Sequence, residues 1–267
     1  QMCIRDRSNA VLYANSVLGA RTNREGGPLA LFEALTGRAP FIGLHLDEYR
    51  MPTVVYDLKD VSDFLDEKEA YAELGYYIGE VEEKGVPAIV NPPKGLIKLH
   101  NVKTFLAAIG ASSSIGMVLI EGLSPEFDVE KIRGLPIVKV SREDLTGIRE
   151  KFSGGEGVVV LGCPHLFPGE IKEIYRFFKS HKLAKEVILF TSRYALKEVG
   201  EEIHALRRMG VKVFLDTCMV VADLKRMGIR GVVTDSAKAA YYLQSQGIEV
   251  SLMSRGEALN YACKDDD

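Results

Sequence analysis

The sequence feature that most constrains the fold is a regular alternation of apolar, strand-like runs and helical segments between residues 135 and 262. The pattern predicts strands at 157–161, 186–190, 212–215, 231–234 and 249–252. It predicts helices at 170–179, 196–209, 222–227, 237–244 and 256–262. Strand–helix repetition at this spacing indicates a mostly parallel sheet with helices on both faces, and hence an α/β protein.

The chain before residue 135 shows similar elements less regularly. Strands are predicted at 41–44, 88–90 and 115–120, and helices at 67–84 and 102–108. Further upstream, helices at 10–20 and 29–35 flank a polar, glycine-bearing loop of the kind that often holds a site. The expected organisation is a helix-loop-helix at 8–40, a first α/β unit at 41–133, a second at 134–262 and a tail at 263–267.

Composition argues against several classes of protein. The 267 residues, 46% of them hydrophobic and 27% charged, are enough for one large core or two moderate ones. The formal charge of −3 comes from mixed acidic and basic residues, without the basic excess that nucleic-acid binding requires. Apolar runs such as 157–161 are far too short to cross a bilayer. Four cysteines without a signal peptide do not form a secreted disulfide framework, so we expect a reducing cytoplasm.

Polar and reactive side chains follow four consecutive strands of the second predicted unit. The ligands of a parallel sheet bind outside the carboxyl ends of its strands, which share one edge. The residues at these ends are Gly162–His165, Thr191–Arg193, Asp216–Cys218 and Asp235–Lys238. They could therefore converge on one pocket that contains two thiols, an imidazole, an arginine and a lysine.

Cys163 and Cys218 are the candidate metal ligands. Cys163 precedes a predicted helix, whose N-terminus favours the thiolate form, and Cys218 closes an analogous strand. Two such thiols suit zinc or an iron–sulfur cluster. Spacing alone leaves open that both are buried apolar residues, and that His165 is a hydrogen-bonding residue at a helix start.

Three basic residues are candidates for binding an anionic substrate. Lys238 lies in the first turn of a predicted helix, where a cation is unfavourable unless it reaches an anion, and a solvated lysine is the alternative. Arg21 and Arg24 lie in the loop RTNREGG, where either could bind a carboxylate or phosphate in bidentate fashion. An internal ion pair with Glu25 is the alternative for both arginines.

Several segments together resemble the aconitase X family. They are SNAVLYANSVLGARTNREGGPLAL from Ser8, LTGRAPFIGLHLDEYR from Leu35, LGCPH from Leu161, LDTCMVV from Leu215 and TDSAKAAYYL from Thr234. These segments are spread over most of the chain from residue 8 to about 262. The resemblance implies an aconitase-like fold and a hydro-lyase that carries an iron–sulfur cluster.

The resemblance also implies roles for individual residues. Family members hold the cluster with three cysteines and leave one iron open, as in aconitase, so a 4Fe–4S cluster is favoured over 2Fe–2S. Two of these cysteines match Cys163 and Cys218. Ser8 and Lys238 match substrate contacts of the family. A lysine and an arginine would hold the carboxylate and any phosphate of the substrate, so Arg21 and Arg24 are also candidate contacts. The residue that acts as base stays unknown.

The implied reaction is loss of water from a hydroxy acid. The branch that the chain resembles most uses (R)-5-phosphomevalonate, in an archaeal-type mevalonate pathway, and a bacterial branch uses cis-3-hydroxy-L-proline. A small subunit with a swivelling domain completes the site as a heterodimer in this family. The alternative from another class is a non-catalytic zinc-binding or structural α/β protein.

The first residues depart from the family pattern. QMCIRDR at 1–7 resembles translated sequencing-adapter sequence, so we treat it, with Cys3, as an artefact. Arg7 stands where the family has an acidic residue before Ser8. The family's third cluster cysteine lies upstream of that serine, and Cys263 matches no ligand motif. We therefore expect an incomplete active site, so that this chain alone is inactive.

Overall fold

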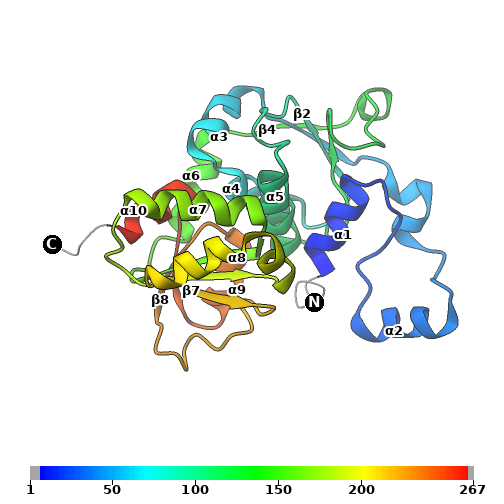
Figure 1. Cartoon of the computed structure of the whole chain (residues 1–267). Coiled ribbons are helices and arrows are strands. Elements are labelled where there is room, and N and C mark those ends of the chain that lie inside the picture. The colour runs from blue at the N-terminus through cyan, green and yellow to red at the C-terminus, as the bar shows by residue number, and fades with distance from the viewer. Residues whose placement is uncertain (1–6, 264–267) are drawn as a thin grey trace.

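The computed structural model describes residues 7–263, with the backbone alone for Arg7 and Ser8. Two parallel β-sheets, each flanked by helices, make up the body of the molecule (Figure 1). The predicted α/β class with two units of parallel sheet is therefore confirmed. No helix within the described part of the chain is long and apolar enough to span a membrane.

The first sheet has the strand order β3-β2-β1-β4, and all its pairings are parallel. Its strands are β1 (Val54–Asp57), β2 (Pro87–Val90), β3 (Leu119–Ile120) and β4 (Ile137–Lys139). Helices α3 (Ser62–Lys68) and α4 (Tyr71–Glu82) follow β1, α5 (Leu99–Ser112) follows β2, and α6 (Arg142–Lys151) follows β4. The first three residues of β1 are buried because strands flank it on both sides.

The strand predicted at 41–44 is wrong. The 3-10 turns Gly43–His45 and Asp47–Arg50 occupy this part of the chain, and Phe41 and Ile42 are 81% and 60% exposed. A run of four apolar residues is too short to show the alternation that identifies a strand. Such a run becomes a strand only where a neighbouring strand pairs with it. Strands β1 and β4 and helix α6 have no counterpart among the predicted elements.

The second sheet has the order β7-β6-β5-β8-β9, again with parallel pairings. Its strands are β5 (Val158–Leu166), β6 (Val187–Thr191), β7 (Lys212–Leu215), β8 (Gly231–Thr234) and β9 (Glu249–Leu252). Its helices are α7 (Pro168–Ser180), α8 (Arg193–Arg208), α9 (Ala237–Ser245) and α10 (Arg255–Ala262). All five predicted strands are confirmed. The helix predicted at 222–227 is wrong, because this short segment forms turns that end at Gly228, whose φ is +81°.

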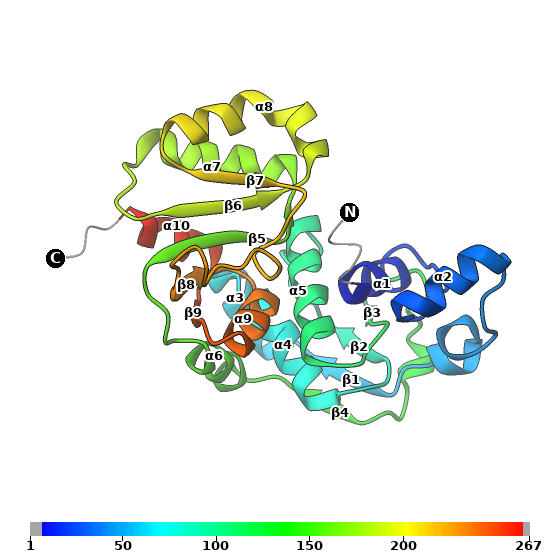
Figure 2. The same ribbon diagram turned by 90° about the horizontal axis from the view of Figure 1, so that it is seen from below.

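Helix α5 joins the two units. It passes between the two sheets (Figure 2) and packs against α1, α4, α9 and β5. Phe105 and Leu106 of α5 belong to the core of the first unit, whereas Ala108 belongs to a cluster that also contains Val160 and Ile188 of the second sheet. One helix therefore contributes to two hydrophobic cores.

The α4–α5 contact depends on glycine. A Cβ atom on Gly75 of α4 would overlap the Phe105 carbonyl of α5, so the two helix backbones approach more closely than alanine allows. We expect Gly75→Ala to destabilise the protein by about 1–3 kcal/mol, as overpacking does, despite the better helix propensity of alanine. Gly147→Ala is the matched control, because Gly147 lies in α6 with nothing within 4 Å of the added methyl. The free energy of unfolding of the control, measured by urea unfolding, should rise by roughly 0.5–1 kcal/mol. Equal stability changes in the two variants would contradict close packing at Gly75.

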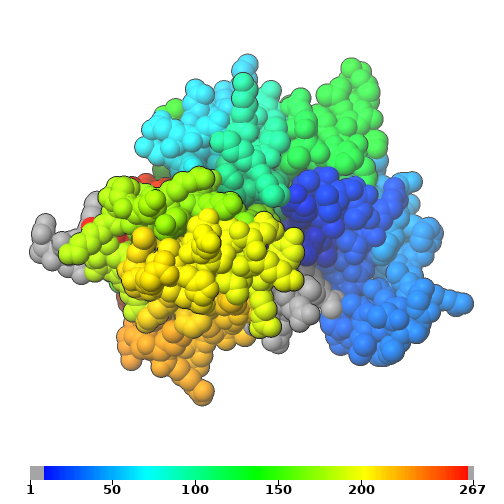
Figure 3. Space-filling model, viewed as in Figure 1, coloured from blue at the N-terminus to red at the C-terminus, as the bar shows by residue number. Residues whose placement is uncertain are grey.

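The N-terminal part of the description comprises α1 (Arg7–Ser16) and α2 (Gly27–Thr36). Helix α1 packs on α5, whereas α2 lies at the tip of an arm that projects from the body (Figures 1 and 3). No side chain of α2 is buried, although the helix is rich in apolar residues. Leu31, Phe32 and Leu35 are all exposed. The arm therefore adds little to either core.

Candidate functional site

A cavity of about 650 Å³ lies where the carboxyl ends of β5 and β6 face α1 and α5. Its walls come from Asn9 and Tyr13 of α1, Lys103 of α5, His165 of β5 and Ser192 after β6. Two of the predicted strand-end segments therefore border one cavity. A second cavity, of about 790 Å³, lies near β9 and α10 and includes Cys263 but no predicted site residue.

A bulge in β5 shapes the segment around Cys163. The register of β5 with β6 shifts between Leu161 and Leu166, so the residues between them depart from the ladder. Gly162 has a φ of +108°, and a Cβ atom there would overlap the Phe190 carbonyl. Cys163 is buried, with 7% exposure, in a cluster that also contains Phe190 and Met219.

The segment around Cys218 lies beside this bulge. Cys218 follows β7, which is separated from β5 by β6 alone. The Asp216 amide donates to the Thr191 carbonyl over 2.9 Å. Across the end of β6, the Nε2 atom of His165 lies 2.6 Å from the Thr217 carbonyl oxygen. This contact joins the residue two positions after Cys163 to the residue directly before Cys218.

The donor set at this edge fits part of a metal centre. Cysteine thiols suit zinc and iron–sulfur clusters, and burial keeps Cys163 away from bulk water, whereas Cys218 is half-buried. Within residues 7–263 no group of three His, Cys, Asp or Glu side chains is placed to hold a metal ion. The described residues thus fit two ligands of a larger set, and the ligand assignment itself stays a prediction.

Lys238 lies in the first turn of α9, which follows β8 at the same edge of the sheet. The Ser236 hydroxyl caps this helix by accepting a hydrogen bond from the Ala239 amide over 3.1 Å. Lys238 is only 6% exposed, which contradicts the solvated-lysine alternative. A buried cation in the first turn of a helix is unfavourable unless other groups compensate its charge. Binding of substrate by Lys238 stays a prediction.

Tyr242 lies one turn after Lys238 in α9 and is half-buried. Burial raises the pKa of the Tyr242 phenol, the positive charge of Arg24 opposes that rise, and Cys163 adds to it. Nothing in the sequence pattern separates this tyrosine from the neighbouring Tyr241.

The two arginines of the loop have structural partners. Arg24 donates to three carbonyl groups at and after the C-terminal end of α5, and burial lowers its pKa. Arg21 forms an ion pair with Asp47 and donates to the His45 carbonyl over 3.0 Å. The carbonyl partners of Arg24 are Gly110 at 3.0 Å, Ser113 at 2.7 Å and Ile115 at 3.1 Å. These contacts anchor the loop on α5, and substrate binding by either arginine stays a prediction.

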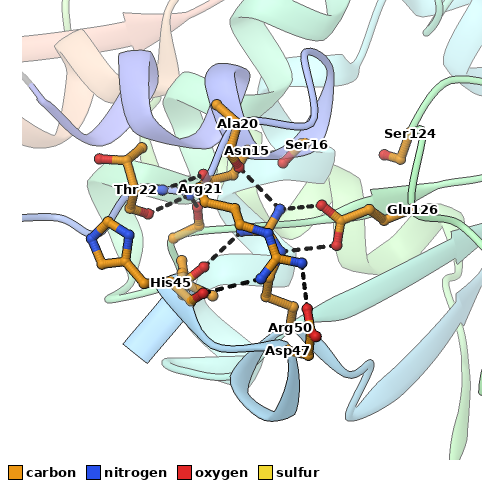
Figure 4. A network of polar contacts seen from close by, with 12 residues as sticks. Asn15, Ser16, Ala20, Arg21, Thr22, His45, Asp47, Arg50, Ser124 and Glu126 are labelled. Atoms are coloured by element: carbon orange, nitrogen blue, oxygen red, sulfur yellow. Dashed lines mark hydrogen bonds and ion pairs between the residues drawn. The ribbon is translucent and has the colours of Figure 1, made fainter. Parts of the chain in front are cut away.

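A polar network fixes the chain between α1 and the first sheet (Figure 4). Asn15 donates to the Thr22 carbonyl over 2.8 Å and accepts from the Thr22 amide over 3.1 Å. The buried Arg50 binds both carboxylate oxygens of Glu126 and donates to the Ala20 carbonyl over 3.0 Å. The polar loop is therefore held at its base.

The Arg50–Glu126 pair makes stability depend on pH. Its hydrogen bonds hold the pKa of Glu126 below the ordinary value of 4.5. A depressed carboxyl pKa adds stability that is complete above 4.5 and is lost as the pH falls through the lower, folded value. We expect urea unfolding to show that Glu126→Gln is destabilised near neutral pH, and that this difference shrinks below pH 4.5. Glu130→Gln, at an exposed pair with Arg133, should show no such change. A constant difference for Glu126→Gln across this range would contradict the assignment.

Four charged groups form a chain beneath the cavity. The Lys103 ammonium lies 2.6 Å from Oε2 of Glu170, and Oε1 of Glu170 lies 2.8 Å from Nη2 of Arg255. Arg255 also donates through Nε to Asp235, over 2.8 Å. Two cations and two anions therefore neutralise one another between α5, α7, α10 and the end of β8. Lys103 and Arg255 were not among the predicted residues, because nothing near them in sequence marks them as partners.

Two predictions lie outside what the structure describes. Ser8 belongs to α1, but its side chain is not described, so its substrate contact stays a prediction. Its neighbour Asn9 lines the cavity. Cys3 and residues 1–6 of the segment treated as an artefact lie outside the described part, and Arg7 is described by its backbone alone, as the first residue of α1.

Comparison with family models identifies three consecutive domains. The aconitase X first-domain model matches residues 3–48, the second-domain model matches 52–150, and the third-domain model matches 157–264. The first and second sheets fall within the second and third matches. The cavity is bordered by residues from all three matches.

Individual proteins are similar over nearly the whole chain. The phosphomevalonate dehydratase large subunit of Thermococcus kodakarensis is 37% identical, covering 92% of this chain and 64% of the relative, and that of Methanocaldococcus jannaschii is 36% identical, covering 89% and 61%. Cis-3-hydroxy-L-proline dehydratase of Pseudomonas aeruginosa is 36% identical, covering 88% of this chain but 43% of the relative. The crystal structure of Thermococcus kodakaraensis aconitase X in its holo form superposes with a TM-score of 0.86 and 34% identity, covering 96% of this chain and 66% of that one. The chain thus spans less than two thirds of the length of the curated relatives.

Proposed function

Because the chain belongs to the aconitase X family, we propose that it is the large subunit of a hydro-lyase that dehydrates (R)-5-phosphomevalonate to trans-anhydromevalonate 5-phosphate. The observation that carries the proposal is the meeting of the Cys163 and Cys218 segments beside a cavity that α1 also borders. An archaeal-type mevalonate pathway in the cytoplasm is the proposed setting. The names of the archaeal relatives support this choice of substrate.

Cys163 and Cys218 are the proposed ligands of an iron–sulfur cluster, of the 4Fe–4S type. When bound, such a cluster with one open iron supplies a Lewis acid for the departing hydroxyl group. The two thiols come from β5 and from the segment after β7, which β6 separates, and the bulge at Gly162 sets the direction of Cys163. A further thiolate has to come from outside the described residues.

Lys238, Arg21, Arg24 and Ser8 are the proposed substrate contacts. Lys238 is buried at the same sheet edge as the cysteines, where its charge can hold a carboxylate while the α-proton is removed. Arg24 already donates to three carbonyl groups, so its proposed part is to position the loop and to add positive charge. Arg21 is half exposed and can bind a phosphate only by giving up Asp47.

Two alternatives follow from particular observations. The similarity to the Pseudomonas aeruginosa enzyme favours cis-3-hydroxy-L-proline as the second candidate substrate. The alternative from another class is a non-catalytic protein in which the two thiols bind a structural zinc ion, and such a site needs two further protein ligands. The archaeal relatives are called large subunits, so the proposed partner is a small subunit with a swivelling domain, forming a heterodimer.

The test uses the protein reconstituted anaerobically with iron and sulfide and mixed with an archaeal small subunit. We expect loss of one water from (R)-5-phosphomevalonate, followed by mass spectrometry, only if the third ligand is present. The assay is therefore run in parallel on this chain and on a chain extended with the upstream part of the Thermococcus relative. If the extended chain acts on cis-3-hydroxy-L-proline and not on (R)-5-phosphomevalonate, then cis-3-hydroxy-L-proline becomes the proposed substrate. Inactivity of the extended, cluster-loaded chain toward both substrates would overturn the proposal.

A further inference from the structure

Lys103 reaches from one unit of the fold to the site of the other. It lies on α5, which follows β2 of the first sheet, but its ammonium lies 3.1 Å from the His165 carbonyl of β5. The same nitrogen contacts Glu170 over 2.6 Å and lies 4.2 Å from the centre of the Phe167 ring. Lys103 is only 5% exposed. Its three N–H donors therefore face two oxygen acceptors and one aromatic face.

Charge balance explains one of these contacts but not the other. Burying an ammonium group is costly, and the carboxylate of Glu170 compensates that cost. The bond to the His165 carbonyl adds nothing to the balance of charges. It does supply a donor to a carbonyl in the bulge of β5, where the shifted register interrupts the sheet ladder.

A line of contacts leads from Lys103 to both cysteine segments. Lys103 binds the backbone of His165, two residues after Cys163, and the imidazole of His165 lies 2.6 Å from the Thr217 carbonyl, directly before Cys218. His165 thus links the Cys163 segment to the Cys218 segment through its imidazole and to Lys103 of α5 through its carbonyl.

We propose that Lys103 is a positioning residue for the metal centre, which fixes the β5 bulge and thereby the relative placement of Cys163 and Cys218. This inference rests on the proposed function, because it assigns Lys103 a role toward the proposed ligands. Lys103 touches neither the metal nor the substrate in this role. It transmits the position of α5, and hence of the first unit, to the ligand segments.

Two variants separate positioning from charge balance. Lys103→Met removes both the charge and the donor, and leaves Glu170 with one cation fewer. The double variant Lys103→Met/Glu170→Gln also removes the Glu170 carboxylate that has lost its pair with Lys103. The glutamine can still accept a hydrogen bond from the Phe167 amide and cap α7. Lys151→Met is the matched control, because Lys151 also pairs with a glutamate and lies over an aromatic ring but is exposed.

The first readout is the rate at which iodoacetamide alkylates Cys163, measured by mass spectrometry, together with the urea midpoint of each variant. We expect both Lys103 variants to be alkylated at Cys163 about tenfold faster than the parent or more, as loss of a hydrogen bond to a charged donor allows. The double variant should regain most of the urea midpoint lost by Lys103→Met but none of the protection of Cys163. Wild-type protection in the double variant would overturn the proposal, because charge balance would then be the whole role of Lys103.

The second readout is the thiolate-to-metal absorption of the protein titrated with Co²⁺. Parent and Lys151→Met should give the same spectrum. The double Lys103 variant should give a weakened or shifted band although its urea midpoint is close to that of the parent. If the parent gives no thiolate band, the two cysteines do not bind Co²⁺ without a third ligand, and the alkylation result alone decides whether Lys103 fixes the bulge. A parent-like band in the double variant would contradict positioning while leaving the metal centre in place.

Discussion

Replacing Cys163 or Cys218 by serine is expected to abolish binding of thiophilic metals. Both residues close strands at one edge of the second sheet, and their segments touch through His165 and Thr217. Removing one of two thiolates should weaken Co²⁺ binding by at least about 100-fold, the upper end of the loss that follows removal of an outer-shell partner. Titration with Co²⁺, followed by the thiolate charge-transfer band, measures this effect.

Cys263→Ser is the matched control for the two cysteine variants. Cys263 lies at the end of α10, lines a different cavity, and has a pKa raised by burial. A raised thiol pKa disfavours the thiolate that metals require. The control should bind Co²⁺ within about twofold of the parent, well inside the change expected at a ligand. Equal losses in all three variants would mean that no particular pair of thiols forms the site.

Replacing Arg255 by methionine is expected to cause a large loss of stability. Arg255 is the common partner of Glu170 and Asp235, and the surrounding negative charges raise its pKa despite burial. Without it, Glu170 keeps its pair with Lys103, whereas Asp235 loses both of its contacts with Arg255. Removing one partner of a buried ion pair typically costs about 3–5 kcal/mol in the free energy of unfolding. Urea unfolding at neutral pH measures the effect.

Two further variants make this result specific. Arg226→Met removes an exposed arginine paired with Asp223 and should change stability by less than about 0.5 kcal/mol. Arg255→Lys keeps the charge but not the planar fork, so it should lie between the parent and Arg255→Met. A loss at Arg255→Met no larger than that at Arg226→Met would show that the buried chain of charges adds no stability.

The second unit could be predicted from the sequence because its strands are buried in a parallel sheet. Such strands are continuous apolar runs, and β7, β8 and β9 begin and end where the runs Lys212–Leu215, Gly231–Thr234 and Glu249–Leu252 predict. The first unit was harder, because β3 has two residues and β4 three, which is too short for any periodicity. The domain boundaries at 8–40, 41–133 and 134–262 stay predictions.

The candidate site could be predicted only in part. Strand ends place Cys163, Cys218 and Lys238 on one edge, since that follows from the topology of any parallel sheet. The part played by Lys103 depends on how the two units pack, and its partner His165 is 62 residues away in sequence. A local pattern holds no information about such a contact.

The position of α10 has a consequence for folding during synthesis. This last described helix carries Arg255, which neutralises Glu170 and Asp235, and Glu257, which pairs with Arg149 of α6. A growing chain made from its N-terminus therefore exposes both sheets before the residues that balance their interior charges have left the ribosome. Until then Glu170 and Asp235 are one cation short, and water must still reach them. We therefore expect the second sheet to reach its final packing only after residue 257 has left the ribosome.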